Sequence, residues 1–240
     1  NPQERILLLP DESKPRVGIA MLPFLRERDL RVGKAGEAAD EIRAQVLAGI
    51  KSRYQEAARA TQDLTCPVIA TGHLTVVGAS TSDSERDIHI GGLGAVTSDS
   101  FPQEFCYVAL GHLHRPQATD GAGRVRYAGS PIALSFSEAE DAKEVRILDV
   151  SDAGLDHFGV PVPVFRKLAQ VRTTQAGLEQ ALGGYDAETG KLRPWLEVIV
   201  EDASLEDDLI ERVRSFSEGK AFDVLKVLRG KSAPISGMTV

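Results

Sequence analysis

The chain has 240 residues, of which 42% are hydrophobic, and this suffices for one medium or two small domains with buried cores. No run of 18 apolar residues occurs and no signal peptide opens the sequence, so we expect a soluble, cytoplasmic protein that does not bind membranes. The formal net charge of −7 argues against a general nucleic-acid binder, because Lys and Arg supply most non-specific affinity for phosphates.

The first part of the sequence predicts two short strands, a long helix and a third strand. We expect strands at residues 5–9 and 16–22, and Pro23 ends the second of them. Residues 38–60 predict an amphipathic helix that leads into a strand at 68–70. Its apolar residues recur on one helical face, at Ile42, Val46, Leu47, Ile50 and Tyr54. This order of elements is typical of a layered α/β sandwich, with the helix on one face of a sheet.

Two predicted strands end in a glycine followed by a histidine. The apolar run 68–71 precedes a Gly-His pair that ends in His73, and the run 105–109 precedes a Gly-His-Leu-His segment with His112 and His114. Residues i and i+2 of an extended segment point the same way, so His112 and His114 can direct their imidazoles into one cleft. One histidine after a strand is commonly structural. The repeated pattern favours a metal site at the carboxyl edge of an open sheet.

The sequence around these histidines resembles a known family. Thr71-Gly72-His73 and Gly111-His112-Leu113-His114 resemble the fourth and fifth motifs of the calcineurin-like metallophosphoesterases. Longer segments narrow the resemblance to the SbcD family of bacterial nuclease subunits; they are Pro23 to Arg26, Ala70 to Ser80, Arg86 to Ile88, Tyr107 to His114 and Tyr127 to Phe136. The resemblance runs from about residue 17 to 150 and continues more loosely to about 230.

The resemblance implies a manganese-dependent DNA exonuclease and structure-specific endonuclease, acting in DNA repair, recombination and replication. Two metal ions roughly 3.5–4 Å apart would activate a water and clamp the phosphate. His73 and His112 would bind one ion and His114 the other, with magnesium or zinc as alternatives to manganese. Arg86 and Arg115 are candidate substrate contacts. The implied partners are DNA, an SMC-like ATPase of the SbcC type and a second copy of the same protein.

Three further motifs that open SbcD-like sequences, D-x-H, G-D-x-x-D and G-N-H-D, do not occur ahead of the first Gly-His segment of this chain. We therefore expect the chain to be the C-terminal portion of a longer protein. The catalytic histidine and the carboxylate ligands would lie outside it, so no catalytic residue is expected here and the chain alone should be inactive. Three imidazoles without a carboxylate favour zinc or nickel over manganese, and this portion alone could bind no metal.

The rest of the chain predicts the remainder of that domain and a second one. We expect residues 125–150 to form hairpin strands that complete the sandwich, and the proline-rich segment 160–164 to be a stiff connector. The predicted domains are 1–158, the C-terminal part of the nuclease domain; 159–232, a small α+β domain resembling the SbcD capping domain; and 233–240, a tail. Within the second domain we expect helices at 174–182 and 205–217 and strands at 195–200 and 222–228.

Two other functions remain open. The chain could be part of a calcineurin-like phosphatase or a phosphodiesterase that acts on small substrates. It could also be a non-catalytic scaffold, in which His73, His112 and His114 are structural or bind a single zinc. Cys66 and Cys106 lie beside predicted strands, so we expect reduced thiols and no disulfide framework.

Overall fold

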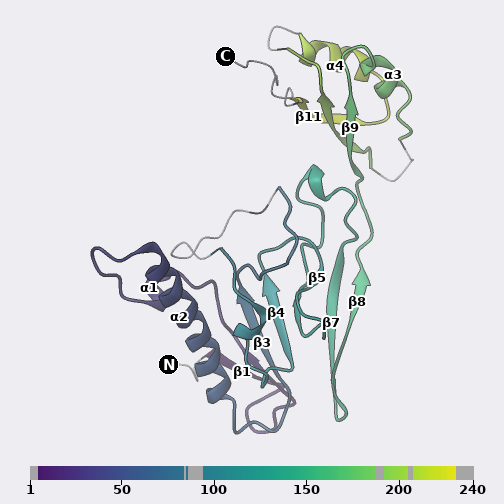
Figure 1. Ribbon diagram of the computed structural model, residues 1–240. Coiled ribbons are helices and arrows are strands. Elements are labelled where there is room, and N and C mark those ends of the chain that lie inside the picture. Colours follow the sequence, from purple (N-terminus) through teal and green to yellow (C-terminus); the bar gives the residue numbers. More distant parts are fainter. Residues whose placement is uncertain (1–4, 84, 86–93, 188–191, 205–207, 231–240) are drawn as a thin grey trace. The chain divides into compact units, whose positions relative to one another are not determined.

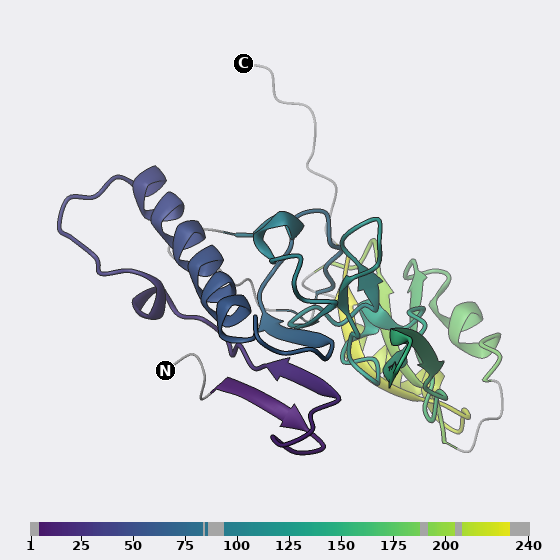
Figure 2. The same ribbon diagram turned by 90° about the horizontal axis from the view of Figure 1, so that it is seen from below.

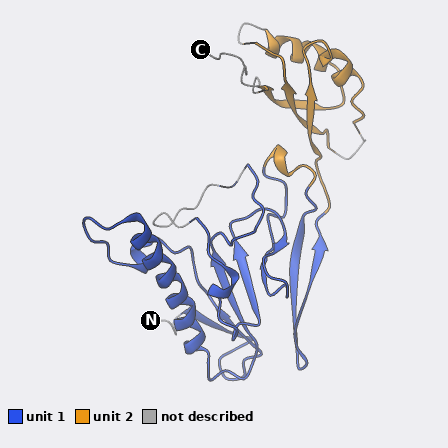
Figure 3. Cartoon of the chain, viewed as in Figure 1, with its two compact units in different colours: residues 1–134, 141–162 blue, residues 135–140, 163–240 orange. Residues whose placement is uncertain are grey.

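The computed structural model describes residues 5–83, 85, 94–187, 192–204 and 208–230. These residues form a mixed α/β structure with three sheets. The chain divides into two compact units, of which unit 1 contains residues 1–134 and 141–162 and unit 2 contains residues 135–140 and 163–240 (Figure 3). No helix in the described ranges is long and apolar enough to cross a membrane.

Unit 1 contains a six-stranded sheet in the order β1-β2-β3-β4-β6-β5 (Figure 1). Its strands are β1 (Ile6–Leu9), β2 (Val17–Ala20), β3 (Val68–His73), β4 (Tyr107–Gly111), β5 (Gln117–Ala118) and β6 (Val125–Tyr127). The four central strands β2, β3, β4 and β6 are parallel, and the edge strands β1 and β5 are antiparallel to their neighbours. The carboxyl ends of β3 and β4 therefore lie at the same edge of the sheet.

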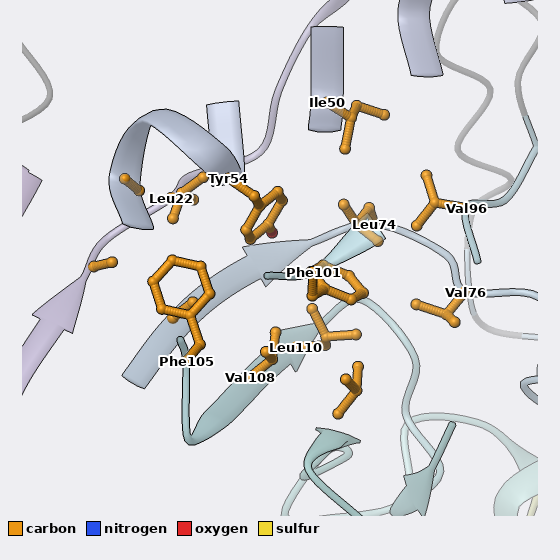
Figure 4. Close-up of a cluster of buried hydrophobic side chains, with 14 of the residues drawn as sticks. Leu22, Ile50, Tyr54, Leu74, Val76, Val96, Phe101, Phe105, Val108 and Leu110 are labelled. Atoms are coloured by element: carbon orange, nitrogen blue, oxygen red, sulfur yellow. The ribbon is translucent and has the colours of Figure 1, made fainter. Parts of the chain in front are cut away.

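The predicted amphipathic helix is present as α2 (Ala39–Ala60), preceded by the short α1 (Glu27–Leu30). α2 crosses one face of the sheet (Figure 1, Figure 2). Its residues Val46, Ile50 and Tyr54 are buried, and they pack in one cluster with apolar residues of the sheet and of the segment around η2 (Ser98–Ser100) (Figure 4). The predicted apolar face of this helix is confirmed.

A β-hairpin packs on the same sheet through a separate apolar cluster. It consists of β7 (Glu144–Ser151) and β8 (Gly154–Pro161), paired antiparallel. Three of its side chains pack with Val17, Ile69 and Tyr107 of the sheet; they are Leu148, Val150 and Leu155. The α2 residues belong to a different cluster, so two separate apolar clusters pack on this sheet.

Residues 125–150 contribute hairpin strands, as predicted, but to two different hairpins. β6 pairs antiparallel with β5 and in parallel with β4, and β7 pairs antiparallel with β8. The turn signal that the prediction missed is at Gly154, where φ is 121°, a backbone angle that glycine adopts without strain. β8 then includes Val160 and Pro161, which the sequence had assigned to the connector.

Unit 2 is built on a parallel three-stranded sheet in the order β11-β10-β9. Its elements are η3 (Phe136–Glu138), β9 (Leu168–Thr173), α3 (Leu178–Gly183), β10 (Trp195–Val200), α4 (Leu209–Ser217) and β11 (Asp223–Arg229). The core contains Leu178, Leu182, Leu196, Val198, Val200, Leu209, Val213 and Phe222. Trp195 opens β10, with the Arg166 guanidinium carbon 4.4 Å from the centre of its ring.

The two helices and two strands predicted for unit 2 are present, although α3 begins at Leu178 rather than at 174. α4 begins at Leu209, and residues 205–207, where the sequence predicted its start, lie outside the described residues. The buried face of α4 is set by Leu209 and Val213. Ile210 is 67% exposed, because it follows Leu209 by about 100° around the helix. β9 was not predicted as a strand. Gly219 takes a φ of 71° just after α4, a conformation in which glycine commonly ends a helix.

Gly72 leaves room for the side chain that anchors α2 to the sheet. The Tyr54 hydroxyl donates a hydrogen bond to the Thr71 carbonyl at 3.1 Å, and the Tyr54 side chain is fully buried. A Cβ atom at Gly72 would overlap the Tyr54 hydroxyl oxygen and lie 3.0 Å from Cδ2 of Leu110. Neither neighbour can move freely in a packed core.

We therefore expect Gly72→Ala to lower the free energy of unfolding of unit 1 by about 1–3 kcal/mol, the usual effect of overpacking. Urea unfolding followed by circular dichroism would measure it. Gly121→Ala is the matched control, because a Cβ atom there meets nothing within 4 Å, and it should change stability by less than about 0.5 kcal/mol. Equal losses in the two variants would contradict the steric explanation.

Candidate metal centre

The carboxyl ends of β3 and β4 bring two histidines together. His73 ends β3 and lies opposite Gly111, the last residue of β4, so that His112 follows directly at the next position. The ring centroids of His73 and His112 are 5.4 Å apart, with 55° between the ring planes. Imidazole nitrogens bind metals at about 2.0–2.1 Å, so two rings this close could share one ion. The predicted pairing of these residues in space is present.

His112 holds an unusual backbone conformation. Its φ is 104°, and it is the one residue other than glycine with a positive φ in the part of the chain that the structure describes. Such a conformation is unfavourable for a residue with a side chain, by of order 1–3 kcal/mol, and is found mainly where the surrounding structure imposes it, often at functional sites. Gly111 before it permits close packing, since a Cβ atom there would lie 3.0 Å from Nδ1 of His73.

His114 is held through both of its backbone polar groups. Its N–H donates to Oε1 of Glu85 at 2.6 Å, and its carbonyl oxygen accepts from the Ser130 N–H at 3.0 Å and from Nζ of Lys143 at 2.9 Å. The two charged side chains are almost fully buried, with 3% exposure for Glu85 and 7% for Lys143. Gly129 permits this approach, because a Cβ atom there would lie 2.7 Å from the His114 carbonyl oxygen.

The segment after β2 forms another side of the site. The Thr71 hydroxyl accepts from the Leu22 N–H at 2.9 Å and donates to the Leu22 carbonyl at 3.2 Å, which fixes this segment to β3. Phe24 follows, and its ring meets the ring of His73 edge-on with centroids 6.0 Å apart. Phe24 remains 44% exposed beside the histidine.

The loop after β3 is fixed by Tyr127 of β6. The Tyr127 hydroxyl donates to the Leu74 carbonyl at 2.7 Å and accepts from the Val76 N–H at 3.0 Å. Tyr127 is fully buried, and burial raises the pKa of its phenol. The neutral hydroxyl therefore serves as a permanent donor and acceptor that holds the chain leaving His73.

Two arginines of unit 1, Arg31 and Arg124, are engaged within the protein. The Arg31 guanidinium, 8% exposed, pairs with Glu27 and Glu37 at 2.7 Å each. The Lys34 N–H and then Arg31 lower the pKa of Glu37 to about 2. Arg124 donates to three backbone carbonyls; they belong to Phe101, Pro102 and Phe105. Both arginines stabilise loops, so neither presents a free cation.

The candidate substrate contacts have different outcomes. Nε of Arg115 donates to Oδ1 of Asp141 at 2.9 Å, and its side chain is 41% exposed beside the His114 segment. Arg86 lies outside the described residues.

No group of three His, Cys, Asp or Glu side chains that could hold a metal occurs in the described ranges. The assignment of His73, His112 and His114 as metal ligands therefore stays a prediction.

Sequence reasoning missed Glu85, Ser130 and Lys143. Glu85 lies in a polar stretch that indicates only a loop, and Lys143 follows an acidic stretch that indicates a solvated one. The signal available for Ser130 was its place in the Gly129-Ser130-Pro131 turn, which the resemblance includes without a role. None of the three is a predicted metal ligand, yet all three contact His114.

Comparison with known proteins gives one consistent answer. Residues 164–237 match the family SbcD_C, described as the type 5 capsule protein repressor C-terminal domain. The chain is 35% identical over 225 residues to the SbcD subunit of the SbcCD nuclease from Escherichia coli strain K12, which covers 92% of this chain and 56% of that protein. The protein of the same name from Rhodobacter capsulatus is 43% identical over 153 residues, covering 62% of this chain and 37% of that protein.

A third relative, the protein of the same name from Bacillus subtilis strain 168, is 52% identical over 82 residues, which is 34% of this chain and 21% of that protein. The chain thus spans about half the length of the Escherichia coli relative. The resemblance to the SbcD family that the motifs predict is confirmed by these matches.

Proposed function

We propose that this chain, which is similar to SbcD-type sequences over most of its length, forms part of a metal-dependent DNA nuclease of the SbcCD kind. The relatives are named as the SbcD component of that nuclease. The whole protein would hydrolyse phosphodiester bonds in DNA as an exonuclease and endonuclease, in DNA repair and recombination. It would act in the cytoplasm as a dimer, together with an ATPase of the SbcC type.

The observation that carries the proposal is the pair of imidazoles at the ends of β3 and β4, with centroids 5.4 Å apart. Side chains at the carboxyl ends of parallel strands are where α/β proteins place their chemistry. A strained His112 backbone supports a functional role, because the fold keeps an unfavourable conformation there. These features fit part of a metal site, to which His73 and His112 would contribute nitrogen ligands for one ion and His114 a ligand for a second.

Two manganese ions, when bound, would supply an activated water and neutralise charge on the phosphate. The residues of this chain would hold and orient those ions. The Glu85, Lys143 and Ser130 contacts hold the segment that presents His114, and Thr71 holds the segment that places Phe24 beside His73. Phe24 limits the access of water to that side of the His73 ring, since the two rings are in edge contact.

The two units also suit this function. Unit 1, with α2 and the hairpin packed on one sheet, would form the second half of a layered metallophosphoesterase sandwich. Unit 2 would be the capping domain, which would contact DNA. The family match over residues 164–237 supports the second assignment, because it falls within unit 2.

The test is hydrolysis by the whole protein with two substrates, single-stranded DNA and a small chromogenic phosphodiester without a nucleobase. We expect DNA to be cleaved in manganese, activity to fall to background with a chelator, and activity to return when manganese is restored. Preference for the small diester would support a phosphodiesterase of small substrates instead. No hydrolysis of either substrate with any divalent metal would support the non-catalytic scaffold.

A further inference from the structure

The side chain of Arg115 is fixed at Nε and otherwise uncommitted. Nε donates to Oδ1 of Asp141 at 2.9 Å. The Arg115 side chain is 41% exposed, against 10% for Asp141. Within the residues that the structure describes, this is the one hydrogen bond of the Arg115 guanidinium, so its two terminal amino groups have no acceptor there. A guanidinium held in this way keeps both amino groups for another ligand.

The backbone on both sides of the Arg115 Cα atom is also held. The His114 carbonyl, which belongs to the peptide bond before it, accepts from the Ser130 N–H at 3.0 Å and from Nζ of Lys143 at 2.9 Å. The Arg115 carbonyl accepts from Nε2 of Gln117 at 3.2 Å. A long side chain whose backbone and Nε are already fixed loses less conformational entropy when it binds a ligand, which lowers the cost of that contact.

Asp141 is the shielded member of this ion pair. Its Oδ1 accepts from Arg115, whereas its Oδ2 is buried, has no hydrogen bond among the described residues and lies 3.8 Å from Nζ of Lys143. Each carboxylate oxygen therefore has a cation beside it. Because the carboxylate is largely covered and Arg115 is not, an anion in solution meets the guanidinium rather than the acid. The exposed part of the pair presents positive charge and N–H donors.

We propose that Asp141 is a positioning residue, which holds the Arg115 guanidinium so that its terminal amino groups bind a phosphate of the DNA backbone. The planar guanidinium can donate two parallel N–H bonds to two phosphate oxygens, and this pairing is among the strongest that a protein makes with an anion. Contacts to the phosphates orient a protein on DNA without reading its sequence. The inference rests on the proposed function for the identity of the ligand.

The first test is binding of labelled single-stranded DNA to the whole protein, by fluorescence anisotropy over a series of salt concentrations without divalent metal. Arg115→Gln should bind about tenfold more weakly. The slope of log affinity against log salt should fall by about 0.7, the loss of one phosphate contact. Arg43→Gln is the matched control, because Arg43 is 45% exposed and also pairs with an aspartate, Asp40. Equal values for the two variants would overturn the phosphate contact.

The second test uses the sign of the effect at Asp141. Removing a negative charge beside bound DNA should by itself strengthen binding, whereas loss of positioning should weaken it. We expect Asp141→Ala to bind DNA about two- to tenfold more weakly, the cost of ordering one long side chain, with an unchanged salt slope because Arg115 keeps its charge. Asp141→Asn retains an oxygen that can accept from Nε, so it should bind at least as tightly as the native protein.

A double variant shows whether Asp141 acts through Arg115. In a protein that already carries Arg115→Gln, Asp141→Ala should weaken DNA binding no further. Tighter binding by Asp141→Ala alone, or an equal loss with and without Arg115, would overturn the positioning role. Because Arg115 is exposed, Arg115→Gln decides the phosphate contact even if an Asp141 variant loses stability. A native protein that binds no DNA would count against the proposed function itself, whereas native binding unaffected by Arg115→Gln would overturn this inference alone.

Discussion

Replacing His112 by glutamine is expected to reduce manganese-dependent cleavage of DNA by the whole protein about a thousandfold. A bound metal contributes several kcal/mol of transition-state stabilisation, and about 4 kcal/mol corresponds to three orders of magnitude in rate. His112 lies beside His73 at the site, with ring centroids 5.4 Å apart, so its loss would remove one of two neighbouring ligands. Initial rates at saturating manganese would measure the effect.

His157→Gln is the matched control. His157 lies on β8 and packs against Tyr107 at the start of β4, whereas His112 follows the end of that strand. Its Nδ1 atom is 2.5 Å from Nη2 of Arg146, and a glutamine oxygen could replace that acceptor. This variant should retain activity. Equal losses in the two variants would mean that activity responds to damage anywhere in unit 1.

A His112→Gly variant separates ligand loss from loss of fold. Glycine adopts the φ of 104° found at this position without strain, so the variant should be more stable by about 1 kcal/mol and still lack activity. Activity retained by this more stable variant would exclude His112 as a ligand. A stability no higher than that of the native chain would show that the imidazole makes compensating contacts.

Replacing Lys143 by methionine is expected to lower the free energy of unfolding of unit 1 by about 1–3 kcal/mol. The substitution deprives buried polar groups of one partner, although Asp141 keeps its ion pair with Arg115 and the His114 carbonyl keeps the Ser130 N–H. Here the ammonium, 7% exposed, lies 3.8 Å from Asp141, whose side chain is 10% exposed, and it also donates to the His114 carbonyl. Methionine has similar length but supplies no donor, so the carboxylate and the carbonyl would lose their common partner.

Lys51→Met is the control for this substitution. Lys51 pairs with Asp99 at 3.3 Å, and both side chains are open to solvent, at 36% and 70% exposure. Pairs of this kind contribute about 0–1 kcal/mol. Urea unfolding followed by circular dichroism would compare the two variants. If Lys143→Met were no more destabilising than Lys51→Met, the buried network would have no special role in stability.

The elements with strong periodicity could be predicted from the sequence. α2 has apolar residues at Val46, Ile50 and Tyr54, and this spacing has one explanation, a helix with a single buried face. β10 is almost continuously apolar and buried on both faces. β9 was missed because it is an edge strand that places only Ala169 and Val171 against the core. Two apolar residues at alternate positions give too weak a pattern to be recognised.

The candidate site was predicted only as far as local patterns extend. His73 ends β3 and His112 directly follows β4, so the Gly-His pattern was enough to predict that they lie together. Glu85 and Lys143 each lie 29 residues from His114, one on either side, and both contact its backbone. A backbone N–H or carbonyl can form a hydrogen bond whatever side chain the residue carries. The identities of the two residues therefore give no indication in the sequence that such a contact forms. These contacts depend on how the loops close, which only the folded chain shows.

The position of the chain's single tryptophan determines what optical experiments can report. Trp195 opens β10 in unit 2, beside Arg166, whereas three of the four tyrosines, Tyr54, Tyr107 and Tyr127, lie in unit 1. Indole emission therefore reports on unit 2, and phenol emission reports mainly on unit 1. Recording both signals along one denaturation curve gives each unit its own internal reporter without any label.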